Sequence, residues 1–238
     1  MFAREGYLLI GLSLVLGVIL VLIGLRFGVV GRSVLFILAG LVIAFTLYFF
    51  RDPQRTPPPE AAQGFLLLAP ADGKVVVVDT VDFEPLYLKG PARQVSIFLS
   101  PLNVHVNRAP ADGVIEFDQY VSGEYLVAWH PKASEKNERS QLGLRHQTGT
   151  KVLFKQIAGA VARRIVYHIS VGDTVRAGER FGIVKFGSRM DLLVPPHVLL
   201  DVKVGDRVTA GETILGRIPV QPVAPLDSSR AAATTEGL

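Results

Sequence analysis

The chain changes its hydrophobic pattern near residue 50. Before this point, residues 7–25 and 33–50 form two runs without a charged side chain, and Arg26 and Arg32 lie between them. As helices that rise about 1.5 Å per residue, both runs nearly match the ~30 Å hydrocarbon core of a bilayer. A signal peptide has a single, shorter apolar core. The pattern predicts a transmembrane helical hairpin over residues 1–50, and the alternative is a pair of buried helices in a soluble protein.

Beyond the hairpin the sequence predicts strands. Residues 51–64 form a stiff, proline-rich linker, and residues 65–219 hold short β-branched apolar runs separated by Gly, Pro, Asp or Asn. This pattern is typical of a β-rich domain with tight turns. Residues 125–143 are polar and predict a long loop, and residues 220–238 predict a disordered tail. The apolar runs lie at residues 74–81, 94–99, 114–117, 151–157, 165–169, 181–186 and 213–218.

Two sequence motifs, called the shorter and the longer phrase below, each occur twice in the chain. Ala-Pro-Ala-Asp-Gly occupies residues 69–73 and 109–113, and Val-Gly-Asp-x-Val-x-Ala-Gly-Glu occupies residues 171–179 and 204–212. The longer phrase encodes turn, short strand and turn, as in lipoyl- and biotinyl-type β-sandwiches. Repetition indicates two related halves, and a closed sheet leaves no exposed edge. We expect a mainly β fold, a closed pseudo-symmetric barrel or sandwich-hybrid-like domain; the alternative is that the longer phrase is generic turn chemistry.

Composition narrows the range of functions. The 238 residues include no cysteine, which excludes thiol nucleophiles, cysteine-ligated zinc, iron–sulfur clusters and disulfides. The formal charge of +4 does not argue for nucleic acid, and no pair of the five histidines has the spacing of a metal site. Arginines flank the hairpin ends (Arg4, Arg51, Arg55) and also lie in its turn. By a small margin this favours a cell-membrane protein whose main domain is cytoplasmic.

Gly187-Ser188 is the only Gly-Ser dipeptide in the chain. A glycine carbonyl is the least hindered acyl group for attack by the next hydroxyl, and glycine tolerates the strained backbone that the attack requires. An ordinary turn is the alternative. Carrier domains of the lipoyl type need a lysine at a hairpin tip, whereas Lys185 and Lys203 lie inside strand-like runs. The sequence therefore argues against a covalent carrier.

A histidine and two aspartates are candidates for proton chemistry. His105 follows an apolar run, where it is either a structural residue or a proton shuttle. Asp72 and Asp112 precede glycine in the two copies of the shorter phrase, a position where aspartate commonly forms turns. Either carboxylate could instead orient a histidine, as in an Asp–His–Ser relay.

Seven stretches, in order along the chain, resemble the short prokaryotic form of the phosphatidylserine decarboxylase family. This family makes its own cofactor. The resemblance implies that Ser188 attacks the Gly187 carbonyl, that the chain breaks between them, and that Ser188 becomes a covalent pyruvoyl group, so no metal or nucleotide is needed. The stretches are FFRDP (49–53), APADGKV (69–75), SPLNVHVNRAP (100–110), NER (137–139), QIAG (156–159), ARRI (162–165) and GIVKFGSRMD (182–191).

The resemblance also implies the reaction and its partners. The pyruvoyl carbonyl would form a Schiff base with the amine of phosphatidylserine, and loss of CO2 would give phosphatidylethanolamine. Fragments 1–187 and 188–238 would remain together as a heterodimer, working on a phospholipid in the membrane. A membrane hairpin suits a lipid better than a soluble amino acid. Two alternatives stay open: a pyruvoyl decarboxylase of another amine, and a non-enzymatic membrane-anchored β-sandwich adaptor.

Residue roles carry over one at a time. Asp72 matches the family's catalytic aspartate and His105 its catalytic histidine, so Asp72 would hold His105, and His105 would activate Ser188. Asp112 would be a structural copy of Asp72. The longer bacterial form has Leu-Gly-Ser-Thr where this chain has Phe-Gly-Ser-Arg, and a second histidine where this chain has Arg108. His105 would therefore serve both in self-cleavage and in turnover.

Overall fold

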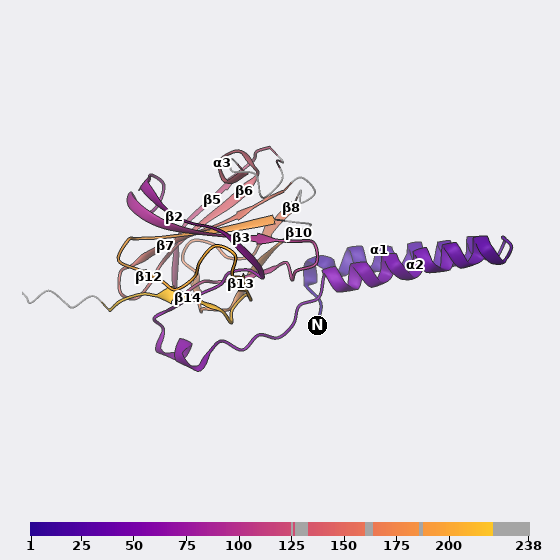
Figure 1. Cartoon of the computed structure of the whole chain (residues 1–238), viewed down its shortest axis with the longest axis horizontal. Helices are drawn as coiled ribbons and strands as arrows, with labels where there is room; N and C mark the ends of the chain where they lie inside the picture. The colour runs from indigo at the N-terminus through magenta and orange to yellow at the C-terminus, as the bar shows by residue number, and fades with distance from the viewer. Residues whose placement is uncertain (125, 127–132, 160–163, 186–187, 221–238) are drawn as a thin grey trace, which may run out of the picture.

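Two long helices project from a β-rich body in the computed structural model (Figure 1). The structure describes residues 1–238 except 125, 127–132, 160–163, 186–187 and 221–238, so nearly all of the predicted tail lies outside the described residues. The chain begins at the junction between helices and body, and its first residues pair with the end of the second helix, where Ala3 N donates to Phe50 O at 2.9 Å.

The predicted hairpin is present as α1 (Tyr7–Gly24), preceded by the 3₁₀ turn η1 (Arg4–Gly6), and α2 (Val29–Phe49). The two apolar helices have mean hydropathies of 2.7 and 2.2 and are long enough to cross a membrane. They are not the buried helices of a soluble core, because most of their apolar surface faces outward, where contact with water is unfavourable. Side chains that are more than half exposed include Leu8, Leu12, Val18, Leu22, Ile37 and Leu41.

Small residues set the contact between the two helices. Ser13, Gly17 and Gly24 are buried on α1. A Cβ atom on Gly17 would lie 2.6 Å from Cδ1 of Ile43 on α2, closer than packed carbon atoms approach. Small residues let helix backbones approach in this way, as they do between transmembrane helices.

The strands of the described residues form one large sheet and two small ones. The large sheet has the order β13-β2-β3-β11-β7-β6-β5-β9, and the small sheets have the orders β1-β14-β12 and β4-β10-β8. Two further short helices are η2 (Pro59–Gln63) in the linker and α3 (Ala133–Lys136). The strands are β1 (Leu66–Leu68), β2 (Gly73–Glu84), β3 (Gly90–Leu99), β4 (Val106–Arg108), β5 (Gly113–Val121), β6 (Arg139–Arg145), β7 (Lys151–Ile157), β8 (Arg164–Tyr167), β9 (Thr174–Val175), β10 (Arg180–Lys185), β11 (Ser188–Val194), β12 (Leu199–Leu200), β13 (Arg207–Val208) and β14 (Ile214–Arg217).

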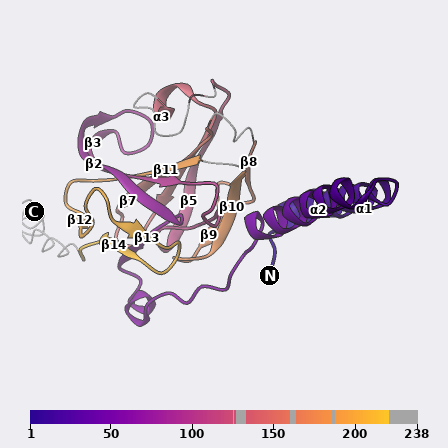
Figure 2. The same cartoon turned by 45° about the vertical axis from the view of Figure 1, so that its right-hand side comes forward.

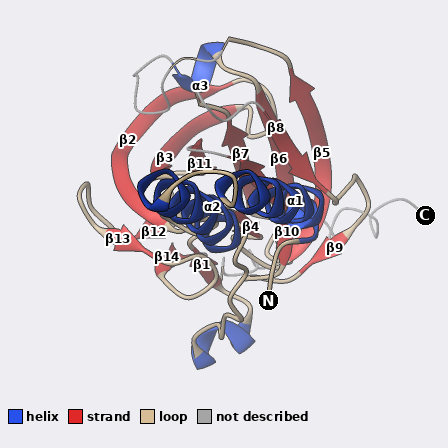
Figure 3. Cartoon of the chain, turned by 90° about the vertical axis from the view of Figure 1, so that its right-hand side faces the viewer, coloured by secondary structure: helices blue, strands red, loops and turns tan. Residues whose placement is uncertain are grey.

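The prediction of a closed barrel was wrong. Figure 3, which looks along the helices, shows the large sheet curling into a half-barrel. Its end strands, β13 and β9, do not pair with each other, and each has only two residues, too few to build a closing ladder. The small sheet that contains β12 and β14 lies on the side of the body away from the helices, and the one that contains β8 and β10 lies on the side next to them (Figure 2).

The repeated phrases occupy equivalent places in two halves, as predicted. In one half the Val75 N–H donates to Asp206 O, and in the other the Ile115 N–H donates to Asp173 O, both at 2.9 Å. The last residues of the shorter phrases, Gly73 and Gly113, pair with Val208 and Val175, so each shorter phrase pairs with one copy of the longer phrase. The equivalence is structural and not an accident of turn composition.

The two halves meet at the shorter phrase itself. The Leu68 N–H donates to Pro110 O at 2.7 Å, and the Arg108 N–H donates to Pro70 O at 2.9 Å, a reciprocal exchange across an approximate two-fold axis. This crossing joins the halves without closing the large sheet.

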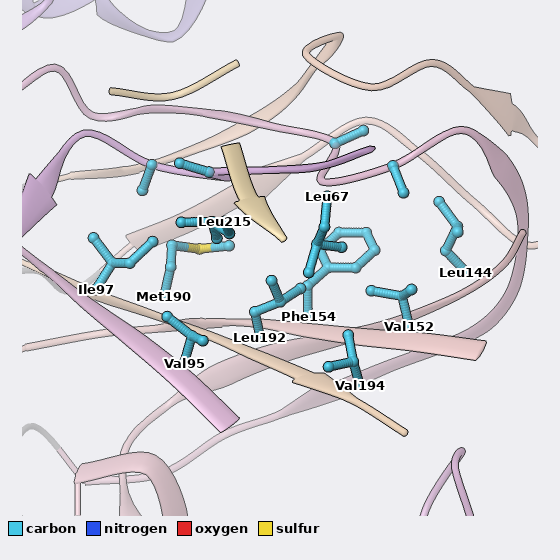
Figure 4. Packing of buried hydrophobic residues seen from close by; sticks show 14 of the residues in the cluster. Leu67, Val95, Ile97, Leu144, Val152, Phe154, Met190, Leu192, Val194 and Leu215 are labelled. Carbon is cyan, nitrogen blue, oxygen red and sulfur yellow. The ribbon is translucent and has the colours of Figure 1, made fainter. Parts of the chain in front are cut away.

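Apolar side chains from both halves fill the space inside the curl. Figure 4 shows Leu67 and Leu215 from one small sheet facing Ile97, Phe154 and other side chains of the large sheet. The cluster also contains Met190 and Leu192 of β11, the central strand whose seven residues are all buried.

Candidate active site

The three residues predicted to be catalytic lie at one end of three adjacent strands. Asp72 immediately precedes β2, His105 follows the turn after β3, and Ser188 begins β11, in the sheet order β2-β3-β11. Antiparallel ladders fix this arrangement, because Lys74 pairs with Phe98 and Ser188 pairs with Leu99. The fold therefore brings together residues that are up to 116 positions apart in the sequence.

Ser188 is fully buried at the start of β11. Its Oγ finds no hydrogen-bond partner among the described residues. A buried hydroxyl without a partner costs free energy, on the order of 1–3 kcal/mol, and such exceptions mark sites of strain or chemistry. Gly187, the other predicted member of the cleavage site, lies outside the described residues.

Residues just after Ser188 anchor its strand from the opposite face. Arg189 Nε donates to Asp191 Oδ1 at 2.6 Å, and the same guanidinium donates to Ser96 Oγ of β3 at 2.8 Å. Both charged side chains are almost completely buried. Loss of either partner would leave a buried charge unpaired, which is strongly destabilising. Arg189 and Asp191 of the predicted motif therefore hold the start of β11, where Ser188 lies, against β3.

His105 is completely buried beneath the end of α2. Its ring lies 4.2 Å, centroid to centroid, from the ring of Phe49, and its Nδ1 lies 3.0 Å from Asn103 O. A carbonyl oxygen only accepts, so Nδ1 carries the proton and Nε2 is the basic nitrogen. Burial, together with the positive charge of Arg51, lowers the pKa of His105 to about 4, against a smaller opposing effect of the Asn103 contact. The imidazole is therefore neutral at pH 7.

Asp72 makes two contacts that differ in kind. Oδ1 accepts from the Ala210 N–H at 2.8 Å, and Oδ2 accepts from Arg55 at 2.7 Å. Burial raises the pKa of the Asp72 carboxyl, while the Ala210 N–H, Arg55 and Arg51 oppose the rise. Among the described residues the carboxylate holds Arg55, and not His105 as the resemblance implies. The role of Asp72 towards His105 remains a prediction.

Asp112 shares one of these contacts and lacks the other. Its Oδ1 accepts from the Ala177 N–H at 2.7 Å, the equivalent of the Asp72–Ala210 bond in the other half. Among the described residues it forms no ion pair of the Asp72–Arg55 kind. Both aspartates therefore close a turn, and Asp72 alone also belongs to a charged cluster.

Arg108, which stands where the longer bacterial form has a second histidine, is buried and structural. It donates to Gly178 O at 2.8 Å and approaches Asp52 Oδ1 at 3.4 Å. Asp52 Oδ2 in turn accepts from Arg180 Nε at 2.7 Å. Arg108 thus ties the exit of the helical hairpin to the crossing between the halves.

Sequence reasoning did not single out a buried amide chain beside Ser188. Ser140 Oγ donates to Gln156 Oε1 at 2.8 Å, and Gln156 Nε2 donates to Asn107 Oδ1 at 2.8 Å. Asn107 Nδ2 has no hydrogen-bond partner among the described residues. Gln156 is the ladder partner of Met190, which lies two residues along β11 from Ser188, so the side chains of Gln156 and Ser188 face the same side of the sheet. Asn107 and Gln156 lie within the stretches SPLNVHVNRAP and QIAG that carry the resemblance, and this was the signal that could have identified them.

The described residues contain no cluster of His, Cys, Asp or Glu that could hold a metal ion. The candidate site holds a serine hydroxyl, a neutral imidazole and a carboxylate at neighbouring ends of β11, β3 and β2. These groups suit proton transfer and attack by a hydroxyl.

Comparison with known proteins gives a consistent result. The family model described as phosphatidylserine decarboxylase matches residues 42–216. A phosphatidylserine decarboxylase proenzyme of Salinibacter ruber is 66% identical over 191 residues, covering 80% of this chain and 83% of that relative. Proenzymes of the same name from Symbiobacterium thermophilum and Amoebophilus asiaticus are 42% and 43% identical, covering 91% and 90% of this chain and 95% of each relative.

These matches favour an enzyme over the non-enzymatic adaptor that the sequence pattern had left open. They extend across the end of α2, the sheet and the three candidate residues. The chain belongs to the phosphatidylserine decarboxylase family and is a carboxy-lyase.

Proposed function

We propose that this chain cleaves itself between Gly187 and Ser188, converts Ser188 into a pyruvoyl group, and uses it to decarboxylate phosphatidylserine to phosphatidylethanolamine. The observation that carries the proposal is the buried Ser188 Oγ, which lacks a partner among the described residues at the start of a central strand. The residues present fit the group, because a hydroxyl held away from water and from competing hydrogen bonds is suited to react.

Self-cleavage needs no external cofactor. Ser188 Oγ attacks the Gly187 carbonyl, the peptide C–N bond breaks, and an ester forms with a free amine on Ser188. Removal of the Ser188 α-proton then breaks the ester C–O bond, leaving a carboxylate on Gly187 and a dehydroalanine at position 188. Water hydrolyses the imine form of that residue, releasing ammonia and leaving the pyruvoyl carbonyl. His105 Nε2 is the base that we assign to the first proton transfer.

The fold supports a stable pair of fragments. After cleavage the new chain start would lie at the first residue of β11, which pairs with β3 on one side and β7 on the other. Three further strands of fragment 188–238 pair with fragment 1–187 or with each other, since β13 pairs with β2 and β14 pairs with β1 and β12. Separating the fragments would expose a completely buried strand, and so they stay together.

In turnover the pyruvoyl group supplies a carbonyl that condenses with the substrate amine and accepts the electron pair released as CO2 leaves. The residues of this chain bind the lipid, exclude water and move protons. His105 is buried and neutral, so it can accept a proton during condensation and return one after CO2 has left.

The helical hairpin supports a membrane location for this chemistry. We propose that residues 1–50 span the bilayer, that residues 51–64 link them to a catalytic domain of residues 65–219, and that this domain is cytoplasmic. The apolar, outward-facing helices support the span. Their packing onto the body through Phe49, Phe50, Val104 and Val106 holds His105 close to the membrane surface.

The intact mass of the detergent-solubilised protein tests the proposal. We expect two species, split between residues 187 and 188, with the C-terminal one lighter than its unmodified sequence by the difference between serine and pyruvoyl. Purified protein should also release CO2 from phosphatidylserine in mixed micelles. A single full-length mass from folded protein that fails to decarboxylate the lipid would overturn the proposal.

Asp72 and Asp112 offer a matched pair of variants. Asp72→Ala and Asp112→Ala each remove one bond to a backbone N–H in an equivalent turn, and the loss of this bond should lower the free energy of unfolding by about 1 kcal/mol in both. Asp72→Ala also removes the ion pair with Arg55, so it should be the less stable of the two variants. We expect Asp112→Ala to cleave itself and turn over substrate normally, and Asp72→Ala to lose most of its decarboxylation. Equal activities in the two folded variants would contradict the assignment of Asp72 to the site.

A further inference from the structure

A basic pocket of about 650 Å³ lies beside Asp72. Its walls come from the end of α2, the turn after β3, the start of β2 and β13. Ser100 in the wall directly follows Leu99, the ladder partner of Ser188. The pocket therefore extends from the base of the helical hairpin to the edge of the candidate active site.

Two cations face each other across the strands that form this pocket. Lys74 of β2 and Arg207 of β13 are ladder partners, and both side chains are exposed. Like charges directly opposite on adjacent strands repel each other. Among the described residues neither side chain forms an ion pair or a hydrogen bond. The one carboxylate in the wall, Asp72, is already paired with Arg55 at 2.7 Å.

A third cation is held at the membrane end of the pocket. The Arg51 guanidinium lies 3.8 Å from the centroid of the Tyr48 ring and donates to Tyr48 O at 2.7 Å and to Leu102 O at 2.9 Å. These contacts use part of the guanidinium's five N–H donors. Arg51 also lies near enough to Asp72 and His105 for its charge to lower the pKa of both.

The internal repeat shows that the fold does not require these charges. The ladder position of Lys74 and Arg207 recurs in the other half as Val114 and Thr174, which are also partners and also exposed. A neutral pair therefore satisfies the same backbone geometry. The charged pair is a departure from the repeat, and it occurs on the side that carries Asp72.

We propose that Lys74, Arg207 and Arg51 bind the phosphodiester of the substrate phospholipid, an inference that rests on the proposed function. Arginine and lysine are the usual phosphate ligands, and the pocket volume suits a polar lipid headgroup. Tyr48 and the exposed Leu102 border the pocket where α2 ends, on the side from which the acyl chains would come. The headgroup amine would then lie towards Ser100, next to the end of β11 at which Ser188 lies.

The test transplants the neutral pair from one half into the other. Lys74→Val with Arg207→Thr recreates the Val114–Thr174 pair, so the variant should fold and cleave itself as the wild type does. With phosphatidylserine in neutral detergent micelles we expect KM, as mole fraction, to rise at least tenfold, because hydrogen bonds to charged groups are lost. The value of kcat should stay within about twofold. Val114→Lys with Thr174→Arg, the inverse swap, should leave both constants unchanged.

Competition experiments distinguish a site for the phospholipid headgroup from a site for free phosphate. Soluble glycerophosphoserine should compete with substrate in the wild type far better than inorganic phosphate does, and the transplanted variant should lose that competition. An unchanged KM in the processed variant would overturn the headgroup site. Equal competition by inorganic phosphate and glycerophosphoserine would also overturn it. The same holds if the only defect of the variant is weaker cosedimentation with vesicles of phosphatidylglycerol. A wild type that neither cleaves itself nor decarboxylates would instead reject the proposed function itself.

Discussion

Ser188→Ala is expected to give a full-length, uncleaved and inactive chain. The variant removes only the hydroxyl oxygen, and Ser188 Oγ has no hydrogen-bond partner among the described residues, so no bond is lost with it. The methyl group of alanine suits the buried position, and the fold should be at least as stable as that of the wild type. Loss of activity would therefore report chemistry and not misfolding. Gel mobility and intact mass check cleavage, and CO2 release checks turnover.

A nearby buried serine provides the control. Ser96 is also fully buried and accepts a hydrogen bond from Arg189 in the strand that Ser188 begins. Ser96→Ala should lower stability by about 1–3 kcal/mol, because Arg189 loses an acceptor, and yet it should be processed. A Ser188→Ala protein that is cleaved between residues 187 and 188 would exclude serine attack as the route.

Local hydrophobic patterns in the sequence predicted those helices and strands that consist of a run of apolar side chains. The charge-free runs predicted both helices, and the run at residues 151–157 coincides with β7 (Lys151–Ile157). The polar region 125–143 was predicted to be a loop, but β6 begins at Arg139. Ser140 and Gln141 are buried there and donate hydrogen bonds to the side-chain amides of Gln156 and Gln119. Such bonds offset the burial of polar groups, and a hydropathy pattern does not contain them.

Contacts between distant side chains could not be predicted in the same way. The resemblance identified Ser188, His105 and Asp72, and the strand order then placed them at one edge. The partner of Asp72 is Arg55 in the linker, and this pairing depends on how residues 51–64 return to the body. The failure of the sheet to close depends equally on long-range packing, since two-residue strands give no local signal.

The repeat was informative in a way that its sequence alone did not show. It predicted two related halves, and the hydrogen bonds of Asp72 and Asp112 confirm that both halves use the same turn. The headgroup site that we propose lies where the two halves differ. Where one half has the ladder partners Val114 and Thr174, the other has Lys74 and Arg207, two cations in the wall of the pocket beside Asp72.

His105→Ala is expected to slow self-cleavage by about 10²–10⁴-fold, the usual contribution of general acid–base catalysis. Time courses of the full-length precursor at 25 °C measure this loss directly. The matched control is His146, another buried histidine whose Nε2 lies 2.6 Å from Gly64 O. It lies in the turn between β6 and β7, at the end of β7 that is away from Ser188. His146→Ala should reduce stability while folded protein still cleaves itself.

The pH dependence of cleavage distinguishes a base from a packing residue. Burial and Arg51 lower the pKa of His105 to about 4, so the neutral, proton-accepting form persists well below pH 6.5. Processing of the wild type should therefore fall only as the pH approaches about 4, where protonation removes the acceptor. Replacement of Arg51 by Gln removes a repelling charge, which should raise the pKa of His105 and move the acid limb to higher pH. A His105→Ala chain that is processed at the normal rate, with only turnover impaired, would show that another group activates Ser188 and would confine His105 to the decarboxylation step.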